Sequence, residues 1–150
     1  MRVGLLLAVA LLSFAAPNAG IAQLAVIVHR DNQARDLSVE ALRRLYLGQT
    51  TTFSNGERVI LLECTTLQNT FYHKALNMSP ELVHRHWIGL VFRGEDAIPP
   101  QPMRDADAVK RFVADHPGAI GFVDLKAADA SVRVLTIGGY APGDPNYPLP

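Results

Sequence analysis

Apolar positions along the chain follow two spacings, which predict strands and helices in alternation. Residues 24–28 and 59–62 are continuous apolar runs, as in strands that are buried on both faces of a sheet. Residues 119–123 form a third such run, and residues 132–137 alternate between apolar and polar positions as an edge strand does. The stretches between these runs have apolar residues at helical spacing. The chain is therefore expected to form an α/β fold, with a small mixed sheet flanked by about four helices.

Helix-start signals precede each of the four helical stretches. Ser38, Ser79 and Asp105 are N-cap residues, and Pro80 follows at the first helical position of the third helix. Residues 65–68 match a capping box, with Thr65 as N-cap and Gln68 reaching back to it. The buried faces of the helices are predicted to be Val39, Leu42, Leu45 and Tyr46; Leu67, Phe71, Tyr72, Ala75 and Leu76; Val83, Trp87, Leu90 and Val91; and Val109, Phe112 and Val113.

The two ends of the chain differ in character from its middle. Residues 1–22 read as a secretory signal peptide, with Arg2 as the basic region, residues 4–16 as the apolar region and small residues at 20–22 for cleavage. The expected location is therefore the periplasm. Residues 23–137 are expected to form one domain, and residues 138–150, which are rich in Gly and Pro, a loose tail.

Composition and motif spacing narrow the classes of function. The chain carries 14 Lys and Arg against 14 Asp and Glu, so it has no basic field for nucleic acid or a membrane surface. Cys64 is the only cysteine, which rules out an internal disulfide and favours a buried thiol over a catalytic or pairing one. His84 and His86 stand two apart, a spacing that does not form a metal pair on a helix. We expect no metal, no cofactor and no enzymatic activity.

The stretch from residue 59 to residue 71 is the candidate ligand site. It reads as a buried strand, a short polar turn and the first turn of a helix. A helix start leaves backbone N–H groups unpaired and carries the positive end of the helix dipole, so it suits an anion. In open α/β sheets ligands also gather at the carboxyl ends of strands. The expected ligand-binding residues are Thr65, Thr66, Gln68 and Asn69; helix capping alone is an equally good interpretation of the two threonines.

Four pieces of the chain occur in the order found in one protein family. They are residues 26–28 with Asn32 and Ser38; LYLGQTTTFSNG at residues 45–56; residues 59–71; and GAIGFV at residues 118–123. With these pieces the sequence resembles the phosphate-binding proteins of bacterial ABC transporters, in the periplasmic-binding-protein-like superfamily. The resemblance implies one lobe of a type II binding-protein fold, since the chain is too short for the two lobes of full-length members.

The resemblance also bears on the ligand. Family members usually carry Ser-Gly-Thr-Arg at the turn into the helix, where residues 65–68 of this chain are Thr, Thr, Leu and Gln. Without the arginine, a bidentate charge-assisted contact is lost and oxyanion binding is expected to be weak. The first hypothesis is thus a transporter component that binds a phosphate-like oxyanion. The alternative is a ligand-free interaction or sensory module that binds a membrane transporter or receptor, or pairs two copies through its exposed lobe face.

Overall fold

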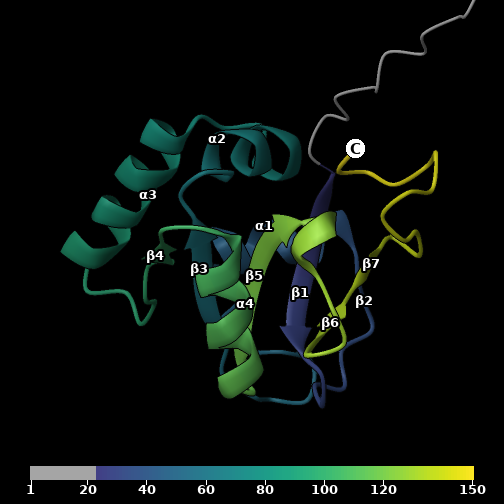
Figure 1. Ribbon diagram of the computed structural model, residues 1–150. Helices are drawn as coiled ribbons and strands as arrows, with labels where there is room; N and C mark the ends of the chain where they lie inside the picture. Colours follow the sequence, from purple (N-terminus) through teal and green to yellow (C-terminus); the bar gives the residue numbers. More distant parts are fainter. Residues whose placement is uncertain (1–22) are drawn as a thin grey trace, which may run out of the picture.

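A mixed five-stranded sheet lies at the centre of the structure, a computed structural model that describes residues 23–150 (Figure 1). Its strands are β1 (Leu24–His29), β3 (Ile60–Cys64), β4 (Gln101–Met103), β5 (Ala119–Asp124) and β6 (Val132–Val134). They lie in the order β4–β3–β5–β1–β6. β3 is parallel to β4 and β5, whereas β1 is antiparallel to β5 and β6. The predicted mixed α/β architecture is confirmed; the predicted signal peptide lies outside the described residues.

Helices cover both faces of this sheet. They are α1 (Val39–Tyr46), α2 (Gln68–Phe71) with its π-helical continuation η1 (Tyr72–Leu76), α3 (Pro80–Phe92), α4 (Ala106–Asp115) and the 3-10 turn η2 (Leu125–Ala127). Neighbouring residues of a strand point to opposite faces. On β5, Gly121 faces Val109 of α4, and Phe122 faces Phe71 of α2 and Tyr46 of α1. The sheet is therefore the middle of three layers, with α4 on one side and α1 and α2 on the other.

Three of the four predicted helix starts are confirmed as side-chain caps. Each cap oxygen accepts a hydrogen bond from a first-turn N–H group, which would otherwise have no partner in the helix. The bonds run from Ala41 N to Ser38 Oγ at 3.0 Å, from Leu82 N to Ser79 Oγ at 3.3 Å, and from Ala108 N to Asp105 Oδ1 at 2.8 Å. These caps fix the first residue of α1, α3 and α4.

An aromatic cluster fastens the helices to the sheet. Phe71 stacks on Phe122, with ring centroids 3.8 Å apart and planes 8° apart, and meets Tyr46 edge-on at 4.9 Å. The Tyr46 hydroxyl donates to the Leu62 carbonyl at 2.9 Å, and Trp87 Nε1 donates to the Tyr46 carbonyl at 3.0 Å. The cluster thus ties α1, α2 and α3 to β3 and β5.

Gly121, inside β5, has a side chain of α4 as its close neighbour. A Cβ atom at this position would lie 2.5 Å from Val109 Cγ1, which is closer than real Cβ contacts come. The glycine therefore lets α4 pack directly on β5.

Several strand boundaries differ from the prediction. β3 extends to Cys64, two residues beyond the predicted end, and β4 was not expected at all. The predicted edge strand at residues 132–137 is divided into β6 and β7 (Thr136–Ile137), and β7 pairs in parallel with a short β2 (Asp36–Leu37). The division at Leu135 lets one segment serve both the main sheet and the two-stranded sheet.

Two predictions about burial were wrong. Val91 was assigned to the buried face of its helix but is 55% exposed, because nothing among the described residues packs over that side of α3. The C-terminal segment was expected to be a loose tail, yet Tyr147 and Leu149 are buried. Burial of these two side chains holds the Gly- and Pro-rich segment against the domain.

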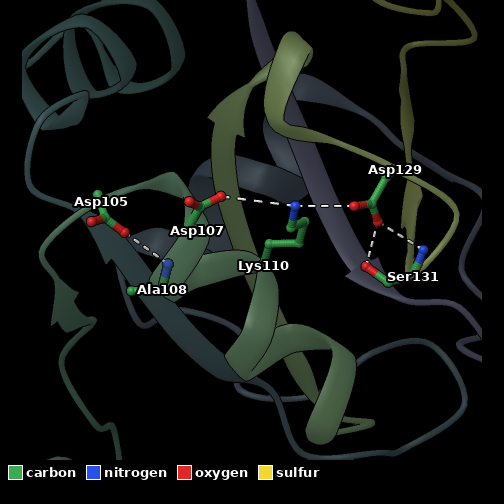
Figure 2. A network of polar contacts seen from close by, with 6 residues as sticks. All are labelled: Asp105, Asp107, Ala108, Lys110, Asp129 and Ser131. Atoms are coloured by element: carbon green, nitrogen blue, oxygen red, sulfur yellow. Dashed lines mark hydrogen bonds and ion pairs between the residues drawn. The ribbon is translucent and has the colours of Figure 1, made fainter.

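A polar network joins the start of α4 to the loop before β6 (Figure 2). Lys110 Nζ lies 3.0 Å from Asp129 Oδ2 and 3.8 Å from Asp107 Oδ1. The other carboxylate oxygen of Asp129 accepts hydrogen bonds from the hydroxyl and the backbone N–H of Ser131. Hydrogen bonds from Ser131, followed by the contact with Lys110, lower the pKa of Asp129 to about 2.

The network predicts an acid-dependent contribution of Asp129 to stability. A carboxyl group whose pKa is lowered on folding stabilises the folded chain above its unfolded pKa of 3.8, and the effect is lost as the pH falls towards 2. Asp129→Asn should lower the urea midpoint at pH 7, and the difference from the parent protein should vanish near pH 2. Asp107→Asn, which removes only the longer contact, is the control and should change the midpoint less. A difference between Asp129→Asn and the parent that persists at pH 2 would contradict this assignment.

Candidate functional site

A cavity of about 580 Å³ opens at the carboxyl ends of β3 and β4, between α3 and the segment that leads into β4. Its apolar walls are formed by Trp87, Ile88, Val91 and Phe92 of α3 and by Pro99, Pro100 and Pro102. Its polar residues are Glu63, Thr65, Gln68 and His84. We call this space the α3–β4 cavity. Its size is typical of small-molecule sites, and its place at the ends of parallel strands is where ligands collect in α/β sheets.

Glu63 is the charged group deepest in the α3–β4 cavity. It is the last residue but one of β3 and is only 5% exposed. The Tyr72 hydroxyl donates a hydrogen bond to Glu63 Oε2, and His84 Nε2 lies 3.5 Å from the same oxygen. Burial, and then the contact with Glu63, raises the pKa of the Tyr72 hydroxyl well above its usual range. Tyr72 therefore stays protonated and acts as a fixed hydrogen-bond donor to the carboxylate.

The turn from β3 into α2 lacks the predicted capping box. The N-cap of α2 is Leu67, without a side-chain cap, and the helix begins at Gln68. Thr65 is drawn towards β4 instead: its N–H donates to the Met103 carbonyl at 2.9 Å and its hydroxyl to the Arg104 carbonyl at 3.2 Å. The unexpected strand β4 thus takes over the groups that were assigned to the cap.

The four predicted site residues do not converge on one point. Thr65 and Gln68 line the α3–β4 cavity. Thr66 and Asn69 are not among its lining residues, and the Thr66 hydroxyl lies 3.3 Å from the sulfur of Cys64. Cys64 itself is fully buried, as expected of a lone thiol. The structure brings two of the four together with Glu63 and separates the other two.

The sequence reasoning missed Glu63, His84 and the outer face of α3. A charged residue directly after a run of apolar strand residues was a usable signal for Glu63. His84 was rejected as a metal ligand and interpreted as a surface or packing residue; residues 23–150 contain no group of three His, Cys, Asp or Glu side chains that could hold a metal ion. Ile88, Val91 and Phe92 widen the apolar stripe of α3 beyond what one buried face requires.

A second hollow, of about 830 Å³, lies over the start of α1 but offers a less distinct site. Its lining is half polar and half apolar and includes Arg35, Arg44 and Ser38. Arg44 pairs with Glu40 at 3.3 Å, and the Ser38 hydroxyl already caps α1. The groups that could bind an anion here are thus mostly engaged within the chain. Within the described residues, no helix is long and apolar enough to cross a bilayer.

The fold is that of periplasmic binding proteins, as the sequence resemblance predicted. A phosphate ABC transporter substrate-binding protein from Clostridium perfringens, solved with bound phosphate, aligns with a TM-score of 0.66 and 16% identity over 80% of this chain and 46% of that one. An ABC-type phosphate transport receptor from Vibrio cholerae gives 0.63 and 17% over 80% and 48%. PstS from Borrelia burgdorferi gives 0.63 and 11% over 80% and 49%.

These similarities concern the fold rather than the site. No family model matches the sequence. This chain spans about half the length of the solved structures that it matches. The first two are a substrate-binding protein and a receptor for transport, and the expectation that this chain has no enzymatic activity stays a prediction.

Proposed function

We propose that this chain is an exported ligand-binding domain whose site lies at the carboxyl end of β3. The observation that carries the proposal is the α3–β4 cavity, which lies at the ends of two parallel strands in a phosphate-binding-protein fold. The cavity contains a deeply buried carboxylate, and buried charge is costly unless it has a partner. A ligand-binding role accounts for the position of the Glu63 carboxylate beside an open apolar cavity.

The ligand that the sequence supports at this end of β3 is a phosphate-like oxyanion, bound weakly. The Gln68 amide is a donor at the edge of the cavity, next to the first turn of α2, whereas the Thr65 hydroxyl donates to the Arg104 carbonyl and can only accept from a ligand. Glu63 can only accept hydrogen bonds while it is ionised, so an oxyanion beside it has to carry a proton. Phosphate carries a proton near neutral pH and sulfate does not. No Arg or Lys lines the cavity in the described part of the chain, which is why the binding should be weak.

The surface of α3 supports a second candidate, a module that binds a protein partner. Phe92 is 87% exposed, and Ile88 and Val91 are exposed beside it. Contiguous exposed apolar side chains often mark an interaction surface. A membrane transporter, a receptor or a second copy of the chain would each cover this face.

Titration with phosphate and with sulfate tests the oxyanion. Trp87 is the only tryptophan and lines the cavity, so its fluorescence reports on occupancy. We expect a saturable change with phosphate in the millimolar range and a weaker one with sulfate. Gln68→Ala should weaken phosphate binding, whereas Asn69→Ala, outside the cavity, should leave it unchanged. The absence of a saturable response to either anion would refute the oxyanion, and concentration-dependent sedimentation of the same protein would then favour the interaction module.

A further inference from the structure

The walls of the α3–β4 cavity are suited to an apolar ligand body. Ile88, Val91 and Phe92 line it and are largely exposed, and Pro99 and Pro100 face them from the segment that precedes β4. None of the described residues covers these side chains. Burial of apolar surface is favourable in proportion to the area removed from water, so this open apolar space favours an apolar occupant over a small hydrated ion.

Glu63 leaves one carboxylate oxygen available to such an occupant. Its Oε2 atom accepts from Tyr72 and lies near His84, whereas Oε1 makes no hydrogen bond with any described residue. Among residues 23–150, Tyr147 Oη is the only side-chain N or O atom that is enclosed without a hydrogen bond, so Glu63 Oε1 is not enclosed. Glu63 lines the cavity, and Oε1 is its carboxylate oxygen without a hydrogen bond to any described residue.

The charges around the cavity favour a cation there. Glu63 is the only carboxylate among the lining residues, and His84 is the only Lys, Arg or His in residues 23–150 whose side chain lies within 4.0 Å of it, with that side chain 53% exposed to solvent. A solvated imidazole at 3.5 Å does not compensate a buried carboxylate as a bidentate Arg would. An anion without a proton to donate is repelled by this carboxylate, whereas an ammonium group would supply the missing partner.

The edge strand argues against an extended peptide as the occupant. β4 is the outermost strand of the sheet beside the cavity, and an edge strand can bind a peptide by adding it as a further strand. Pro102 is the middle of the three residues of β4 and has no N–H group to donate. The edge therefore lacks its central donor, and a small molecule fits the site better than a strand.

We propose that the α3–β4 cavity binds an organic ammonium ion, with the ammonium group on Glu63 Oε1 and the apolar body against α3. This inference rests on the proposed ligand-binding role but not on the oxyanion. The ammonium group donates hydrogen bonds to the free carboxylate oxygen, while Tyr72 holds the other oxygen in place. Ile88 and Val91 contact the apolar body, and Trp87 forms the floor beneath it.

Three probes of similar shape and different charge test the ligand class. Phenethylamine, phenethyl alcohol and phenylpropionate are titrated into the purified protein, with Trp87 fluorescence and calorimetry as readouts. We expect saturable binding of the amine, binding of the alcohol weaker by about tenfold, and no saturable binding of the carboxylate, since a charge-assisted hydrogen bond is stronger than a neutral one by that order. Equal or tighter binding of phenylpropionate would overturn the proposal.

Two variants separate the charge from the apolar contacts. Glu63→Gln keeps an acceptor for Tyr72, and it should weaken amine binding about tenfold while changing alcohol binding by less than about twofold. Glu81→Gln makes the same charge change on α3 outside the cavity and should alter neither. Unchanged amine affinity in Glu63→Gln would overturn the proposal. Saturable phosphate binding without amine binding would refute this inference alone, and amine binding without phosphate binding would refute only the oxyanion.

Discussion

Replacement of Phe71 by alanine is expected to lower the free energy of unfolding by about 3–5 kcal/mol, the range for deletion of a buried aromatic ring. Phe71 is fully buried and stacks on Phe122, with Tyr46 against its edge. The deleted ring lies between the sheet and two helices that are held by hydrogen bonds of their own, so the void cannot close by a small shift. Urea unfolding followed by far-ultraviolet circular dichroism measures the change.

Phe112 is the matched control for this variant. Its ring stacks on His116 with the same geometry as the buried pair, 3.8 Å between centroids and 8° between planes, but at the surface of α4. Phe112→Ala should cost clearly less, because this ring is only partly buried and its removal leaves no closed void. If the two variants lose equal stability, stacking rather than burial determines the effect, and the account of the core given above is wrong.

Leu149→Ala is expected to cost about 2–5 kcal/mol, although the residue is next to the last in the chain. Its side chain is fully buried, so truncation opens a cavity beneath the C-terminal segment. Leu82→Ala is the control, since that leucine lies on the exposed side of α3 and surface substitutions change stability by roughly 0.5 kcal/mol or less. Equal urea midpoints for Leu149→Ala and the parent protein would show that the segment does not pack on the domain in solution.

Local signals account for the parts of the fold that were predicted correctly. The run from Leu24 to Val28 is apolar at every position because β1 is covered on both faces, and Ser38, Ser79 and Asp105 cap helices a few residues away. For the three caps the physical cause lies within one helical turn of its effect. The same holds for the left-handed conformation at Gly48, which ends α1.

The parts that were missed depend on contacts between residues distant in the chain. Thr65 and Gln68 match a capping box, but Met103 and Arg104 bind Thr65 from β4 and the turn after it. β4 has only three residues, and one of them is proline, so the sequence does not indicate a strand here. Tyr147 and Leu149 gain their burial from elements that precede them by many residues.

The candidate site was predicted in position but not in chemistry. Thr65 and Gln68 do line a cavity at the end of β3, as the strand-turn-helix pattern indicated. The cavity receives its charge from Glu63 and much of its apolar wall from α3. The sequence alone does not show that α3 lies beside the carboxyl end of β3. A pattern within one stretch can locate a site, but the walls of that site come from other parts of the chain.

The π-helical turn at Tyr72–Leu76 makes the cavity sensitive to chain length as well as to residue identity. A π-helical turn bonds each N–H to the carbonyl five residues back, so it holds more residues than an α-helical turn. It follows directly on Phe71 and begins with Tyr72, the donor to Glu63. Insertion or deletion of a single residue in α2, ahead of Tyr72, would rotate Tyr72 about the helix axis and separate it from Glu63, although both side chains would still be present.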